Sequence, residues 1–150
     1  MDLLRKFWER SWGDKVLLVR ALGLVSAVRI GLKVLPYRTV QRLMTRSSYP
    51  AGETFVSPEA ALAYRRRVVG IVQTIGKRTL GDKPCLTQAL VAQHMLRLKG
   101  YETTMRIGVT KEGRELLAHA WLERDREIVI GGSETHAKYV PLVPVEPEIA

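Results

Sequence analysis

The most constraining feature of the sequence is the order of segments in its second half, where a helix is followed by alternating strands. Residues 85–99 are predicted to be helical and end just before a glycine suited to a left-handed C-terminal cap. Residues 103–109 and 115–123 alternate between apolar and polar side chains, which predicts two strands joined by a hairpin turn at Gly113. Residues 127–130 predict a third strand.

The first half of the sequence is expected to be helical. The predicted helices cover residues 4–12, 14–35 and 58–76, and residues 37–46 are predicted to form a short basic helix or turn. Asp14 and Ser57 are predicted to be N-caps, and Pro36 ends the long second helix. Residues 47–57 are expected to form a loop, and the proline-rich tail from Pro141 is expected to be extended.

Residues 16–35 are apolar enough to raise the question of a membrane span. Arg20, Arg29 and Lys33 interrupt them, whereas a bilayer requires about 20 mostly apolar residues. We therefore expect no transmembrane helix. A peripheral amphipathic helix remains an alternative.

The positive charge of the chain is concentrated at its N-terminal end. The formal charge is +9, and residues 1–50 hold ten Lys/Arg against three acids, whereas residues 51–150 hold fourteen against twelve. This asymmetry predicts a basic N-terminal helical region, residues 1–50, that meets an anionic partner surface, and a core of residues 51–150. The basic segments lack a motif that reads a groove or stacks bases, so no nucleic-acid partner is expected.

Cys85 is the only cysteine, so no internal disulfide can form and a reducing, cytoplasmic setting is expected. A lone cysteine is usually a small buried hydrophobe. Pro84 places Cys85 in the first turn of its helix, where free N–H groups and the helix dipole stabilise a thiolate. The same N–H groups could donate to a developing oxyanion.

His119 shares one face of its predicted strand with Leu117 and Trp121. If the Cys85 helix packs on that face, thiol and imidazole can form a Cys–His pair; the alternative is a satisfied core histidine. His94 is expected to be a packing or surface residue, and His136 falls in a loop. The sequence has no P-loop, dinucleotide fingerprint or metal-ligand spacing, so no cofactor or metal is expected.

Three segments resemble the transglutaminase-like leader peptidases of lasso-peptide biosynthesis: CLTQALVAQHMLRLKGYETTMRIGV, LLAHAWLERDREIVIGG and YVPL. The upstream segment RALGLVSAVRIGLKVLPYRTVQRLM resembles the N-terminal region of the same proteins. The resemblance implies an α+β fold with a papain-like, transglutaminase-like core, in which a helix carrying Cys85 packs on an antiparallel sheet carrying His119. It implies Cys85 as nucleophile and His119 as general base.

The resemblance also implies a function and partners. The chain would be a cysteine peptidase that removes the leader from a ribosomally made precursor peptide through a thioester. A small leader-recognition protein would dock on the N-terminal helical region, and the cyclase and exporter of the pathway are further candidate partners. Association with a membrane through residues 1–35 is open.

The third member of the site departs from the family pattern. Similar enzymes carry an acid near the end of the strand after the histidine, but here that stretch reads Ile130-Gly131-Gly132-Ser133. Glu134 and Asp125 are the candidate carboxylates, and a backbone carbonyl, a water or an amide could orient the imidazole instead. The missing acid motivates an inactive scaffold as the alternative function, and transfer to an amine instead of water is a further alternative.

Overall fold

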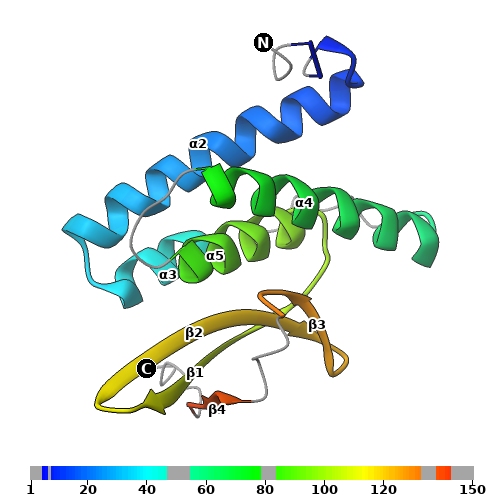
Figure 1. Cartoon of the computed structure of the whole chain (residues 1–150). Coiled ribbons are helices and arrows are strands. Elements are labelled where there is room, and N and C mark those ends of the chain that lie inside the picture. Colours follow the sequence, from blue (N-terminus) through cyan, green and yellow to red (C-terminus); the bar gives the residue numbers. More distant parts are fainter. Residues whose placement is uncertain (1–4, 7, 47–54, 79–83, 133–137, 143–150) are drawn as a thin grey trace.

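The structure is a computed structural model that describes residues 5–6, 8–46, 55–78, 84–132 and 138–142. Over these residues four helices precede a four-stranded antiparallel sheet, which confirms the expected α+β class. In chain order the elements are α2 (Trp12–Val34), α3 (Tyr37–Thr45), α4 (Pro58–Arg78), α5 (Pro84–Arg97), β1 (Thr104–Glu112), β2 (Glu115–Arg124), β3 (Glu127–Ile130) and β4 (Val140–Pro141). The helices form layers above the sheet, with α2 farthest from it (Figure 1).

Side-chain caps set the starts of two helices. The Ser57 hydroxyl accepts the backbone N–H of Ala60 at 3.1 Å and precedes α4, as predicted. The predicted break at Gly13 with Asp14 as N-cap is wrong, because α2 begins at Trp12 and runs through both residues. Ser11 is the N-cap, and its hydroxyl accepts the Asp14 N–H at 3.4 Å. The Asp14 carboxylate lies in the first turn, where the helix dipole favours negative charge.

The sheet has the strand order β3-β2-β1-β4. Gly113, with a φ of 61°, allows the tight β1–β2 hairpin, and both residues of the β2–β3 turn, Asp125 and Arg126, have positive φ. Strand β4 was not predicted; it pairs with β1 opposite Gly108 and Val109. Pairing at the sheet edge suits its proline, which has no N–H to donate.

One core joins the helices to one face of the sheet. Ala120 and Leu122 of β2 belong to it, and their cross-strand partners Ile107 and Met105 pack against it. The Tyr37 hydroxyl of α3 lies 3.3 Å from the Met105 sulfur, and its burial raises the pKa of Tyr37. No helix of the described residues is long and apolar enough to cross a membrane.

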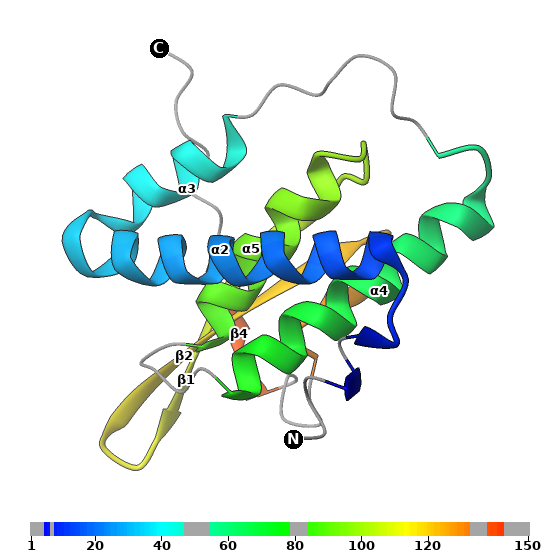
Figure 2. The same ribbon diagram turned by 90° about the horizontal axis from the view of Figure 1, so that it is seen from above.

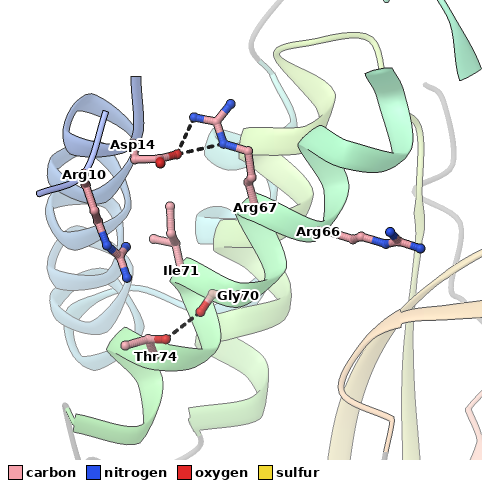
Figure 3. A pocket seen from close by; sticks show the side chains of 7 residues that line it. All are labelled: Arg10, Asp14, Arg66, Arg67, Gly70, Ile71 and Thr74. Carbon is pink, nitrogen blue, oxygen red and sulfur yellow. Dashed lines mark hydrogen bonds and ion pairs between the residues drawn. The ribbon is translucent and has the colours of Figure 1, made fainter. Parts of the chain in front are cut away.

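Charged contacts hold α4 to its neighbours. Arg65 donates to the Glu127 carboxylate at 2.9 Å and to the Ile128 carbonyl at 3.3 Å, which joins α4 to β3. Arg67 donates through Nε and Nη2 to one carboxylate oxygen of Asp14, which joins α4 to α2 (Figure 3). This pair lines an open hollow of about 290 Å³ that is also lined by Arg10.

The Asp14–Arg67 pair gives a pH-dependent prediction. The hydrogen bond from Arg67 holds the pKa of Asp14 below its ordinary value of 3.8. Because folding lowers the pKa of Asp14, the stabilisation by the ion pair is complete above the pKa of the unfolded chain. It is lost as the pH falls through the lower pKa of the folded protein. Both side chains are partly exposed, so we expect a coupling of roughly 0.2–1 kcal/mol.

A double-mutant cycle of Asp14→Asn and Arg67→Gln, measured by urea unfolding, isolates this coupling from the effect of Asp14 on the helix dipole. The coupling energy should be constant from about pH 7 to pH 5 and shrink below about pH 4. A coupling energy that does not shrink below about pH 4 would show that the ion pair does not join the two helices.

Candidate functional site

Cys85 is the second residue of α5 and its half-buried thiol is free. In the first turn of a helix the backbone N–H groups have no intrahelical acceptor and can stabilise negative charge. Residues that follow Cys85 hold the start of the helix by packing. Leu86 packs against the core, and any side chain at Gly76 of α4 would collide with Gln88 of α5.

His119 lies in the middle of β2, directly opposite Gly108 of β1. Its Nε2 lies 2.5 Å from the carbonyl oxygen of Gly131, just beyond the end of β3. A carbonyl oxygen can only accept, so Nε2 carries the proton of this bond. In the neutral ring the lone pair is therefore on Nδ1, which is the nitrogen available to act as a base.

The imidazole belongs to an aromatic cluster. Its ring is stacked on Trp121, with centroids 6.0 Å apart, and its centroid lies 5.1 Å from that of Tyr139. Trp121 is completely buried and its Nε1 donates to Glu123 at 2.7 Å. A Cβ at Gly108 would lie 2.8 Å from the Trp121 ring and 2.9 Å from the Tyr139 Cβ, so the glycine permits this packing.

The cluster lies on the face of the sheet that the helices do not cover. Alternation along β2 puts His119 and Trp121 on one face, whereas Ala120 and Leu122 join the helical core on the other. The Cys85 helix therefore packs on the sheet, but on the face opposite His119, and the condition stated for a direct Cys–His contact is not met in this structure. The reason is steric: alanine at position 120 lets a helix approach closely, whereas Trp121 fills the opposite face.

The candidates for a third member are separated by the structure. Asp125 lies in the β2–β3 turn with its side chain 91% exposed and its carboxylate 3.5 Å from Arg124, so it points to solvent and away from His119. Glu134 lies outside the described residues. The group that hydrogen-bonds to the imidazole is the Gly131 carbonyl, so the imidazole is oriented by a backbone carbonyl, one of the alternatives to a carboxylate. The only sequence signal for it was the glycine pair after β3.

His94, the other histidine that the structure describes, does not join this cluster. His94 of α5 lies with Nδ1 2.7 Å from the Met44 carbonyl of α3, which agrees with a packing role. His136 lies outside the described residues. Within the described part of the chain, no three His, Cys, Asp or Glu side chains gather so that they could hold a metal ion.

Comparison with known protein families identifies the superfamily to which the chain belongs. Residues 22–144 match the transglutaminase-like superfamily, and the chain belongs to that family. The match runs from α2 to just beyond β4 and includes both Cys85 and His119. No curated protein matches the chain, and no solved structure matches it.

The close packing of Gly131 against β2 gives a prediction about stability. Gly131 has a φ of 89°, and a Cβ there would lie 2.8 Å from the Ala120 carbonyl oxygen and 2.9 Å from the Trp121 Cβ. Gly131→Ala should therefore lower the free energy of unfolding by roughly 2–4 kcal/mol, through backbone strain and steric overlap.

Gly113→Ala is the matched control, because Gly113 also has a positive φ but no atom lies within 4 Å of its Cβ position. It should cost only about 1–2 kcal/mol, the backbone term alone. Urea denaturation of both variants measures the difference. Equal losses would contradict the tight packing of Gly131 against β2.

Proposed function

We propose that this chain is a cysteine peptidase that removes the leader from a ribosomally synthesised precursor peptide, with Cys85 as nucleophile and His119 as base. The observation that carries the proposal is the coincidence of family and chemistry. The region that matches the transglutaminase-like superfamily holds the only cysteine of the chain in the first turn of a helix. It also holds a histidine whose Nε2–H is bonded to a carbonyl, which leaves Nδ1 as the basic nitrogen.

The proposed reaction is acyl transfer to water. Nδ1 of His119 takes the thiol proton, and the Cys85 thiolate attacks the carbonyl carbon of the scissile peptide. The carbonyl electrons move to oxygen, which would accept hydrogen bonds from free N–H groups of the first turn of α5. The C–N bond then breaks as the imidazolium of His119 protonates the departing amine. A thioester remains. Nδ1 then takes a proton from water as the water oxygen attacks the thioester carbonyl, and the C–S bond breaks to release the new carboxylate and regenerate the Cys85–His119 pair.

A second candidate is a scaffold that binds the precursor or its recognition protein without cleaving it. The observation that favours it is the placement of His119 on the sheet face remote from the helical core, while Cys85 begins a helix that packs on the other face. In the described structure the hydrogen bond of His119 goes to Gly131 and not to the thiol. A peptidase must bring the two side chains together when substrate binds.

Incubation of a precursor peptide with this protein and its recognition partner, followed by mass spectrometry, separates the candidates. Wild type should release a leader-sized fragment, and Cys85→Ala should release none. His119→Ala should be slower by about 10²–10⁴-fold, because a positioned general base contributes that much. Asp125→Asn should cleave at the wild-type rate, since its carboxylate points to solvent.

Alkylation by iodoacetamide makes a negative result informative, because Cys85 is the only thiol and every adduct reports on it. If His119 activates the thiol, His119→Ala should alkylate several-fold more slowly near neutral pH, whereas the control His94→Ala should not. Equal alkylation rates together with an uncleaved but bound precursor would favour the scaffold.

We further propose that the recognition protein docks on α3. Arg38, Arg42 and Arg46 are exposed on this helix, whereas Val40 is buried. Residues 37–46 hold these three arginines and no Asp or Glu, so the exposed surface of the segment is cationic. An acidic patch on the partner would complement it.

Replacement of the three arginines of α3 by glutamine should weaken binding to the recognition protein by about tenfold or more, and added salt should reduce the difference. Isothermal titration calorimetry measures both effects. The matched control removes the same charge from the exposed sheet turns, at Lys111, Arg114 and Arg126. Equal affinities in the two triple variants would contradict docking on α3.

A further inference from the structure

Helix α2 is apolar on two opposite faces. Its inner face supplies Ala21, Val25 and Val28 to the core. Its outer face is a stripe of large apolar side chains, each at least half exposed: Trp12, Val16, Val19, Leu22, Ile30 and Val34. The intervals between these positions are close to whole helical turns, so the side chains line one side of the helix. We call this set the outer stripe.

The position of α2 leaves the outer stripe open along its length. The helix lies farthest from the sheet in Figure 1 and crosses over α4 and α5 in Figure 2. Its 23 residues give a nearly straight rod of about 35 Å. Because the surface of a helix is convex, a stripe of this length suits a flat partner surface better than a peptide that inserts into a groove.

The end of the stripe is aromatic and cationic. Trp8 and Trp12 are 74% and 80% exposed, and the Lys15 ammonium lies 5.2 and 5.5 Å from the centroids of their rings. Tryptophan with lysine is the combination enriched where membranes meet water, because the ring is amphipathic and the charge remains at the headgroups.

The charges beside the stripe have one sign. Arg20 and Lys33 are exposed on its two flanks. Asp14 is the only acid in α2, and its carboxylate is engaged by Arg67 of α4 (Figure 3). The complement of an apolar stripe with cationic edges is an apolar surface with anionic edges, which describes a bilayer that contains acidic lipids.

We propose that α2 docks this protein on an anionic membrane surface, with the outer stripe in the interface and Arg20 and Lys33 at the lipid headgroups. Docking in this way is peripheral, and it leaves the sheet with His119 on the side of the molecule away from the bilayer (Figure 1). The proposal is independent of the peptidase reaction, because it uses no residue of the candidate site.

Vesicles test the proposal directly with the full chain. Tryptophan emission is a suitable signal, since Trp8 and Trp12 are exposed and Trp121, with no exposed surface, gives a constant background. With phosphatidylcholine vesicles that contain phosphatidylglycerol, the emission should shift to shorter wavelength and the protein should co-sediment. Phosphatidylcholine vesicles alone should give neither effect at physiological salt.

Two pairs of substitutions separate the apolar and charged contributions. Val19→Gln with Ile30→Gln should weaken vesicle binding at least tenfold, because both side chains lose apolar contact with the interface. Arg20→Gln with Lys33→Gln should weaken it by about tenfold or more and reduce its salt dependence. All of these side chains are exposed, so the fold should be retained.

The matched control is Leu116→Gln with Val140→Gln, which removes equally exposed apolar side chains from the sheet. It should bind vesicles like wild type. Equal loss in this control, or no binding of wild type to acidic vesicles, would overturn the proposal. It would also be overturned if sedimentation velocity showed a lipid-free dimer that Val19→Gln with Ile30→Gln dissociates, because a second copy would then cover the stripe.

Discussion

The structure depends on the burial of α5 between the other helices and the sheet. Leu90, Val91 and Leu96 are completely buried and lie on different sides of the helix, so α5 is apolar over most of its circumference. Such a helix is stable only when it is covered on every side. Helices α2, α3 and α4 cover it on one side and β2 covers it on the other, so each of these elements is required by the same central helix. The start of α5, and with it Cys85, is fixed as a consequence.

The side chains of β2 divide the sheet into two environments. The small and aliphatic residues Ala120 and Leu122 face the helical core, whereas His119 and Trp121 lie on the opposite face, where His119 contacts Tyr139. The glycine at position 108 is the steric condition for the second environment, because it leaves room for the Trp121 ring and for Tyr139. The imidazole is thus held by its packing against Trp121 and Tyr139 as well as by its hydrogen bond to Gly131.

Much of the fold could be predicted from the sequence, because local patterns determine it. Hydrophobic periodicity and the Ser57 cap located the helices, and alternation located the first three strands. The features that were missed depend on distant contacts. Ser11 and Asp14 are both good caps, and propensity alone does not choose between them. Strand β4 has only two residues and exists because β1 offers a free edge. The face of β2 that meets α5 depends on which side chains allow close approach, which requires the packed structure.

In the candidate site, too, local patterns were predicted from the sequence and contacts between distant residues were not. The sequence predicted Cys85 and His119 as the catalytic pair, because a thiol at a helix start and a histidine in the following hairpin form a local pattern, and their roles stay a prediction. It left the partner of the imidazole open, and the structure supplies the Gly131 carbonyl. A carbonyl oxygen fixes the tautomer as a carboxylate does, but it carries no full charge and stabilises an imidazolium less. A thiolate–imidazolium pair in this chain would therefore depend more on the dipole and free N–H groups of α5 than in a site where a carboxylate orients the imidazole. The burial of α5 holds that dipole in place, so the constraint that organises the fold also supports the chemistry proposed for Cys85.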